Sequence, residues 1–161
     1  MTVSYGQGFT PVAVPTMRAK VEALQVEVSK QPQYEPPTTH IFHGGMYCRQ
    51  VAQAADALII GKVHKREHFY MVVSGTVVIT TDDGVQRITG PCLLSSMPGT
   101  KRAIYSETDA LYMTLHRTDC TSVEDAEAEM VEEDPTAMFG IGNTLKTTNI
   151  EVEKWPLSQQ P

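Results

Sequence analysis

The sequence predicts an all-β protein, an antiparallel sandwich or barrel with less regular ends. Between residues 38 and 117, short runs rich in valine, isoleucine and aromatic residues recur at close intervals, as half-buried strands do. Turns that contain glycine separate several of these runs. No segment with helical periodicity lies between them. This excludes a parallel α/β sheet, because parallel strands need long crossover connections.

Nine strands are expected from these runs. They are predicted at Thr38–Phe42, Met46–Gln50, Leu58–Val63, Phe69–Val73, Thr76–Thr81, Val85–Ile88, Cys92–Ser95, Arg102–Tyr105 and Leu111–His116. The turns between them are expected at Gly44-Gly45, Ser74-Gly75, Asp82-Asp83-Gly84 and Pro98-Gly99.

The first forty residues are expected to form an N-terminal arm. Residues 1–15 show no regular period and are expected to be extended. Apolar residues at i, i+4, i+7 and i+11 from Met17 to Val28 favour an amphipathic helix. The second half of this segment also alternates as a strand does, so both alternatives stay open. The proline-rich linker QPQYEPP follows at residues 31–37 and cannot lie inside a helix or a central strand.

The chain after the last strand predicts one amphipathic helix and an irregular tail. Thr121-Ser122-Val123-Glu124 has the pattern of a capping box. Apolar residues follow at helical spacing until Pro135 ends the helix. The tail contains Trp155, a single large apolar anchor. We therefore divide the chain into an arm (residues 1–40), a barrel (41–117) and a C-terminal helix with its tail (118–161).

Size and composition narrow the class of protein. A chain of 161 residues suits one domain with a sizeable core. The net charge of −6 argues against nucleic-acid binding through the whole surface. No run is long enough to span a membrane, and the N-terminus lacks the pattern of a secretory signal. The three cysteines are widely spaced, which fits a reduced intracellular environment better than a disulfide framework.

Several side chains that could bind a metal ion or an anion are concentrated in the segment Gly61–Val78. His64, Arg66, His68 and Tyr70 share one parity, so an extended backbone would place all four on the same face. His64 and His68, with His116 from the last strand, could bind a divalent metal ion. This metal site is the first of three interpretations.

The second interpretation is an anion site. Arginine and lysine with tyrosine hydroxyls can hold a phosphate or carboxylate, and the candidates are Arg66, Tyr70, Lys101 and Arg102. The third is a basic surface that pairs with acids of a neighbouring subunit or of the chain's own acidic segment, residues 124–134.

The same residues resemble the cupin superfamily, small jelly-roll barrels. The first cupin signature has two histidines, then a glutamate, and ends at a glycine. Counted back from Gly75, these positions fall on Lys62, His64 and His68. Met97–Arg102 resembles the second signature, with Arg102 at its histidine position. The resemblance covers residues 42–117 and implies a jelly-roll β-barrel. Only His64 matches a ligand position, and His68 stands where the family has a carboxylate.

The sequence is also similar to uncharacterised single-domain cupin-like proteins of tailed bacteriophages. This resemblance implies a non-enzymatic structural or accessory protein of a phage particle, a head decoration or tail-associated component. It would assemble through its terminal arms with copies of itself and other virion proteins, without a cofactor and without direct contact with nucleic acid or membrane. Its expected location is the virion or the host cytoplasm.

The alternative is a small-molecule cupin that uses the His64 and His68 face. It would be a metal-dependent dioxygenase or isomerase, or a protein that binds a small anionic ligand.

Overall fold

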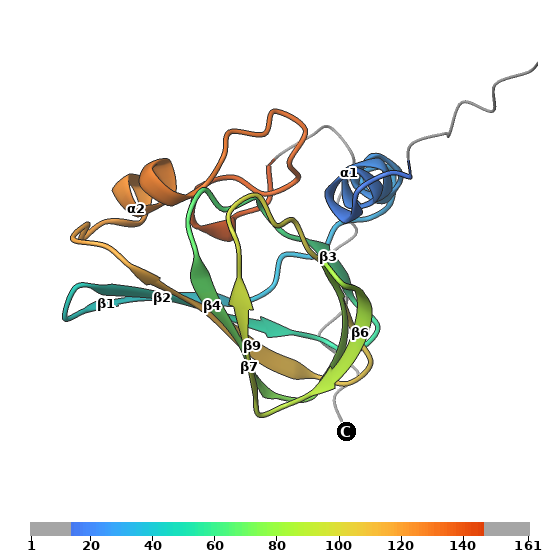
Figure 1. Ribbon diagram of the computed structural model, residues 1–161, viewed down its shortest axis with the longest axis horizontal. Coiled ribbons are helices and arrows are strands. Elements are labelled where there is room, and N and C mark those ends of the chain that lie inside the picture. The colour runs from blue at the N-terminus through green and yellow to red at the C-terminus, as the bar shows by residue number, and fades with distance from the viewer. Residues whose placement is uncertain (1–13, 147–161) are drawn as a thin grey trace, which may run out of the picture.

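A computed structural model describes residues 14–146 of the chain, and these residues form nine strands and two α-helices (Figure 1). The all-β prediction is confirmed, and each expected strand is present. The elements are α1 (Met17–Val28), β1 (Thr38–His43), β2 (Met46–Gln53), β3 (Leu58–Ile60), β4 (His68–Ser74), β5 (Thr76–Thr81), β6 (Gly84–Thr89), β7 (Cys92–Ser96), β8 (Ala103–Ser106), β9 (Ala110–Arg117), α2 (Val123–Met130) and the short 3-10 turn η1 (Ile141–Asn143).

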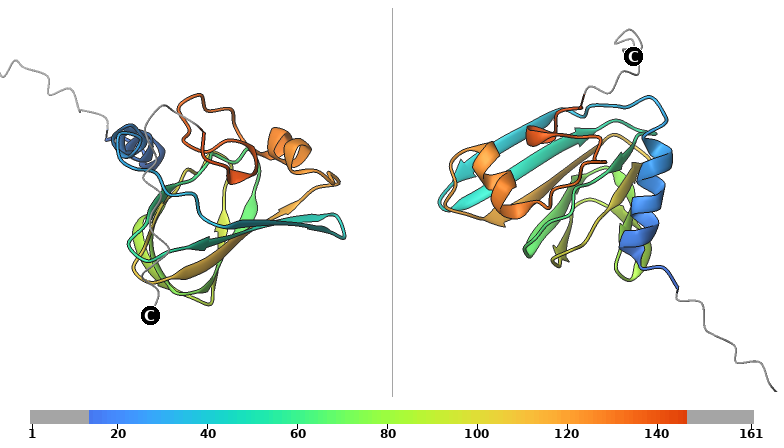
Figure 2. Two further views of the ribbon diagram at one scale, coloured as in Figure 1. Left: turned by 180° about the vertical axis from the view of Figure 1, so that it is seen from behind. Right: turned by 90° about the horizontal axis from the view of Figure 1, so that it is seen from above.

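The strands form two antiparallel sheets that close into a barrel (Figures 1 and 2). One sheet has the order β1-β2-β9-β4-β7, and the other has the order β3-β8-β5-β6. The hairpin β5–β6 is innermost, and β4 pairs with β7, β3 with β8 and β2 with β9 around it. This nested pairing is the jelly-roll topology. The jelly-roll expectation is therefore met by the strand order itself.

The barrel interior holds one apolar core, to which both sheets contribute. Its buried members are Val51, Tyr70, Val72, Val77, Ile79, Ile88, Ile104, Ala110 and Tyr112. They lie mostly on β2, β4, β5 and β9, which form the middle of the two sheets. The core leaves one end of the barrel to polar side chains, and that end contains the candidate site.

Strand β3 ends at Ile60 and not at the expected Val63. From Gly61 onward the chain leaves the sheet, and His64 forms an isolated bridge with Val131, the residue that follows α2. The backbone amide of Lys65 also donates to the carbonyl of Met130 at 2.7 Å. The segment between β3 and β4 is therefore fixed by the C-terminal part of the chain, which sequence periodicity does not reveal.

Residues 17–28 form a helix, as the favoured alternative predicted. The side chain of Thr16 caps its N-terminus by accepting from the amide of Ala19. Val21 is 1% exposed and packs against Ile60 of β3 and Ala103 of β8. Helix α1 therefore lies over the four-stranded sheet (Figure 2), and its apolar stripe is buried there.

Helix α2 is present where it was predicted, but its cap differs. Ser122, and not Thr121, is the N-cap, and its hydroxyl accepts from the amide of Asp125 at 3.2 Å. The helix ends at Met130, well before Pro135, because Val131 takes an extended conformation and bridges to β-structure. The buried face of α2 packs against Tyr47 of β2, so α2 covers one end of the barrel.

The described part of the C-terminal tail contacts the linker before β1 and the first residue of that strand. The side-chain amide of Asn143 donates to the hydroxyl of Thr38 at 3.0 Å, and the amide of Leu145 donates to Glu35 at 2.6 Å. The predicted extended arm up to residue 13 and the predicted anchor Trp155 lie outside the described residues. The division at residues 40 and 117 stays a prediction. Within residues 14–146, neither helix has the length and apolar character needed to cross a bilayer.

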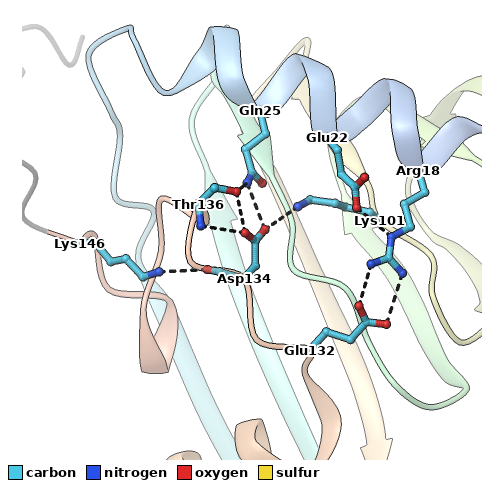
Figure 3. A network of polar contacts seen from close by, with 8 residues as sticks. All are labelled: Arg18, Glu22, Gln25, Lys101, Glu132, Asp134, Thr136 and Lys146. Atoms are coloured by element: carbon cyan, nitrogen blue, oxygen red, sulfur yellow. Dashed lines mark hydrogen bonds and ion pairs between the residues drawn. The ribbon is translucent and has the colours of Figure 1, made fainter.

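A polar network centred on Asp134 joins α1, the loop before β8 and the segment after α2 (Figure 3). Its carboxylate accepts from Lys101 Nζ at 2.8 Å and from Gln25 Nε2 at 3.1 Å. Thr136 donates both its amide and its hydroxyl to the same carboxylate. The Lys101 side chain is only 2% exposed, so Asp134 supplies the counter-charge that a buried ammonium requires.

We expect Asp134→Asn to lower the free energy of unfolding by about 2–3 kcal/mol at pH 7, since it leaves Lys101 without a counter-charge. Partial burial acts to raise the pKa of Asp134, but hydrogen bonds from Lys101, Thr136 and Gln25 outweigh it and hold that pKa well below its usual range. The carboxylate's contribution is therefore present above about pH 4, the value of an unperturbed aspartate, and is lost as the pH falls further.

Urea denaturation of wild type and variant at pH 7 and pH 3 measures this difference. The gap between the two proteins should shrink in acid. Asp83→Asn, in an exposed turn, is the control and should change little at either pH. A gap of equal size at both pH values would contradict the electrostatic account.

Candidate metal centre

Three histidines from distant parts of the chain meet at one end of the barrel. His68 begins β4, and His116 lies near the end of the neighbouring strand β9. Phe69 pairs with Leu115, so the antiparallel register brings His68 and His116 next to each other on the inner face. His64 reaches them from the β3–β4 segment, which its bridge to Val131 holds in place.

The three imidazoles form a compact, buried cluster. Each can offer one ring nitrogen such that all three nitrogens lie within 4.8 Å of one another. The ring centroids are 4.2 Å apart for His64 and His68, 4.9 Å for His64 and His116, and 4.6 Å for His68 and His116. None of the three residues is more than 8% exposed. The structure therefore brings together all three of the metal candidates expected from the sequence.

Neighbouring groups orient the rings. His68 Nδ1 lies 3.2 Å from the carbonyl oxygen of Arg66. With its proton on Nδ1, the ring donates to that oxygen and keeps a lone pair on Nε2. His116 stacks on Tyr47 at 6.0 Å between centroids. Its Nδ1 is buried without a hydrogen-bond partner among the described residues, so this nitrogen is available to coordinate a metal ion.

Burial lowers the pKa of all three histidines. It is the main cause for His68, whose pKa falls to about 4, and for His116, whose pKa falls to about 3. The pKa of His64 also lies well below its ordinary value, because of burial and then the charge of Arg49. All three imidazoles are therefore neutral at pH 7, which is the form that coordinates metal ions.

The shared-face prediction for residues 64–70 is wrong for Arg66. His64, His68 and Tyr70 point into the barrel, but the Arg66 side chain is 53% exposed and forms an ion pair with Glu129 of α2. The chain bends at Lys65 and Arg66 instead of staying extended. Alternate residues share one face only while the backbone stays extended as a strand.

The four anion candidates are not brought to one place. Tyr70 and Arg102 line the same cavity, with the guanidinium carbon 5.4 Å from the centre of the Tyr70 ring. Lys101 is engaged by Asp134, and Arg66 by Glu129. Lys62, which stands at a family histidine position, donates to Glu127 at 2.6 Å. Three basic residues of the barrel region thus pair with the chain's own acidic segment.

A cavity of about 50 Å³ extends from His64 and His68 into the barrel. At roughly 10–15 Å³ for each water molecule, it has room for a few waters or a small ligand. Its polar wall consists of Arg49, Lys62, Tyr70, Thr100, Arg102, Tyr112, Thr114 and Asn143. On its other side, His116 borders an open cleft of about 540 Å³, so the cluster lies between an inner cavity and the protein surface.

Arg49 and Thr114 are among the cavity residues that the sequence reasoning missed. Arg49 lies on β2 with the same parity as the buried Tyr47 and Val51, and this alternation is the signal that could have found it. Thr114 lies on β9 between the buried Tyr112 and His116. Leu111, Met113 and Leu115 on the opposite face of β9 are apolar, so periodicity alone favours that face as the core side and does not indicate Thr114.

Comparisons with known proteins add only a likeness in fold. No family model and no curated protein matches the sequence. Among solved structures, KdgF from Halomonas sp. is similar at 13% identity, over 58% of this chain and 87% of that one, with a TM-score of 0.48. A cupin superfamily protein from Desulfitobacterium hafniense is similar at 14% identity, over 57% and 87% of the two chains, with a TM-score of 0.45.

The Cupin_2 domain of an XRE family transcriptional regulator from Enterobacter cloacae is similar at 13% identity, over 51% of this chain and 95% of that one, with a TM-score of 0.44. Cupin domains therefore occur among the structural neighbours, as the sequence resemblance implied. The resemblance to phage proteins stays a prediction.

Removing the hydroxyl should lower the free energy of unfolding for one tyrosine of the cavity and not for the other. Tyr112 donates to Gln53 Oε1 at 3.0 Å, whereas the Tyr70 hydroxyl has no partner among the described residues. We expect Tyr112→Phe to lower the free energy of unfolding by about 1–2 kcal/mol. Tyr70→Phe should leave it within about 0.5 kcal/mol of wild type or raise it. Urea denaturation measures both, and an equal loss in the two variants would contradict the assignment.

Proposed function

We propose that this chain binds a divalent metal ion at His64, His68 and His116 and uses it to bind and polarise a small molecule in the barrel cavity. One observation carries the proposal: three buried imidazoles, from three separate parts of the chain, offer ring nitrogens within 4.8 Å of one another. An unpaired buried polar atom destabilises a fold. Three clustered imidazoles therefore cost folding free energy unless something binds their ring nitrogens.

The donor set fits a transition-metal ion. Nitrogens bound to one tetrahedral zinc ion lie about 3.3 Å apart, given bond lengths near 2.0–2.1 Å, so small rotations of the rings would suffice. Imidazole suits zinc, copper, iron and nickel. Three protein ligands with an open position are typical of catalytic sites, whereas structural sites have four ligands. An ion held here would act as a Lewis acid toward a ligand in the cavity.

The surrounding residues reduce the electrostatic cost of a bound dication. Lys62 is neutralised by Glu127, and Arg66 points away from the cluster to Glu129. Helix α2 packs on Tyr47, which stacks on His116, and this contact limits solvent at the rings. Of the cations that line the cavity, only Arg49 and Arg102 form no ion pair within residues 14–146.

The structural role in a phage particle stays a prediction. It depends on terminal arms that clasp neighbouring subunits, and residues 1–13 and 147–161 lie outside the described part of the chain. Within the described residues, α1 packs against the barrel, and the carbonyl of Gly140 in the C-terminal tail accepts from Lys62. These contacts favour the small-molecule alternative over the assembly role.

Metal binding is tested by titrating metal-free protein with Co²⁺ and following the visible absorption of nitrogen-ligated cobalt. We expect one ion to bind for each chain. His64→Ala, His68→Ala and His116→Ala should each weaken binding by about 100-fold or more, beyond the roughly 10–100-fold typical of an outer-shell residue. His43→Ala removes an exposed histidine of β1 and is the matched control.

Elemental analysis of untagged protein as purified gives an independent measure. Near-stoichiometric zinc, iron, nickel or copper that disappears in His68→Ala would support the proposal. Absence of cobalt binding in the well-folded wild type would overturn it. So would binding that survives in all three alanine variants, because the ion would then sit elsewhere.

A further inference from the structure

The barrel cavity contains two guanidinium groups that form no ion pair within residues 14–146. Arg102 is 8% exposed and donates to the carbonyl of Thr80 at 2.9 Å and to the hydroxyl of Ser96 at 2.8 Å. Both acceptors are neutral. The half-buried Arg49 lines the same cavity, and its guanidinium forms no hydrogen bond or ion pair with another residue in the described part of the chain. An uncompensated buried charge is costly, and it usually has a partner.

Two other largely buried cations of this domain do have such partners. Lys62, which also lines the cavity, is paired with Glu127, and Lys101 is paired with Asp134. The two arginines are thus an exception within one small domain. The exception lies next to the histidine cluster, where His64 and His68 share the cavity wall with both arginines.

Two hydroxyls without partners complete the pocket. Tyr70 on β4 and Thr114 on β9 are direct cross-strand neighbours, and both line the cavity. Neither the Tyr70 hydroxyl nor Thr114 Oγ1 has a hydrogen-bond partner among the described residues. The cavity therefore combines two unpaired cations with two unused hydroxyl donors.

We propose that this cavity binds a small carboxylate, held by Arg102, Arg49 and the hydroxyls of Tyr70 and Thr114. This deepens the proposed function, on which it rests for the adjoining metal centre, by naming the class of ligand. A guanidinium has five N–H donors, so Arg102 can keep both structural bonds and still donate to a carboxylate. The planar anion matches guanidinium geometry, and a carboxylate group suits a cavity of about 50 Å³.

The test compares acetate with its neutral isostere acetamide by calorimetry on EDTA-treated and Zn²⁺-loaded protein. We expect acetate to bind metal-free protein and acetamide to bind at least about tenfold more weakly, because ion-assisted hydrogen bonds are the stronger ones. Arg102→Gln should abolish acetate binding to metal-free protein. Arg87→Gln, which removes an exposed arginine paired with Glu107, should leave it unchanged.

Tyr70→Phe serves if Arg102→Gln fails to fold. It removes only an unpartnered hydroxyl, so it should weaken acetate binding several-fold without loss of stability. Equal binding of acetate and acetamide by metal-free protein would overturn the carboxylate site, whether or not metal binds. Acetate binding that requires Zn²⁺ and survives Arg102→Gln would overturn it too, since the anion would then be a ligand of the metal alone. If the metal centre fails its own test, acetate binding to metal-free protein still decides whether the carboxylate site exists.

A second, independent observation concerns the outer face of the five-stranded sheet. Burial alternates along β1, β2, β4, β7 and β9, so the outward positions can be assigned. Among the outward residues of these five described strands, only Arg117, at a strand end, carries a full charge. The others are Thr39, Ile41, His43, Met46, Cys48, Gln50, Ala52, Phe69, Met71, Val73, Leu93, Ser95, Leu111, Met113 and Leu115.

The apolar outward residues lie side by side across the strands. Ile41 pairs with Cys48, Cys48 with Leu115, and Leu115 with Phe69. A second row joins Met113, Met71 and Leu93. Leu93 is 56% exposed, Phe69 48% and Ile41 47%, and neither described helix packs on this face. Apolar patches of this extent mark interaction surfaces.

We infer that this face binds a second copy of the chain, face to face around a two-fold axis. Charge favours this partner, because an almost uncharged surface complements its own copy and offers nothing to a charged partner. The area fits as well: five strands about 4.8 Å apart and about 20–25 Å long give about 500 Å² in projection. That is the scale of a standard interface, in which each partner buries roughly 800 Å² of accessible surface.

Sedimentation velocity on full-length protein tests the inference. We expect a dimer for wild type, and a monomer for a Phe69→Glu, Leu93→Glu double variant that keeps the wild-type circular dichroism. Val85→Glu introduces the same charge at a residue 65% exposed on the other sheet and should stay dimeric. Because Trp155 is the single tryptophan, its emission reports separately on residues 147–161.

Two outcomes would overturn the dimer. One is a wild-type monomer whose Trp155 emission shifts in the double variant, which would mean that the chain's own C-terminal segment covers the face. The other is a dimer that persists in the double variant, which would mean that copies meet through another surface.

Discussion

The structure depends on placing neutral imidazoles and charged guanidiniums inside a barrel beside its apolar core. Such groups are unfavourable in a low-dielectric interior unless each has a partner. His64, His68 and His116 avoid the charge cost because burial keeps them neutral. Arg49 and Arg102 cannot lose their charge at physiological pH. Both arginines line one cavity together with the unpartnered hydroxyls of Tyr70 and Thr114, and the proposed ligand site rests on this grouping.

The C-terminal segment compensates the charges that the cavity does not use. Glu127 pairs with Lys62, Glu129 with Arg66, and Asp134 with Lys101, so an acidic segment fastens to a basic edge of the barrel. The same segment fixes the approach of His64, through the bridge at Val131. The uneven distribution of charge along the sequence thus has a structural role. It attaches the helix that covers the site and leaves the cavity arginines free for a ligand.

The five-stranded sheet carries polar side chains on part of its inner face and mostly apolar side chains on its outer face. On β9 the inward side chains are Tyr112, Thr114 and His116, and the outward ones include Leu111 and Met113. A binding cavity explains the polar inner side, and a subunit interface would explain the apolar outer side. A jelly roll built in this way can bind a ligand inside the barrel and associate with another chain through its outer wall, because alternation sends neighbouring residues of one strand to opposite faces.

The sequence by itself determined the strands, the C-terminal helix and the all-β class, and it favoured the N-terminal helix over a strand, because these depend on local periodicity, turn residues and caps. It also named His64, His68 and His116, but it could not show that they meet. That depends on the register between β4 and β9 and on a bridge from the β3–β4 segment to Val131, contacts between residues far apart in the chain. Tertiary structure alone decided that Arg66 turns outward, that Arg49 turns inward and that the polar side of β9 faces the cavity. Parity gives two faces for a strand, and only packing decides which of them is inside.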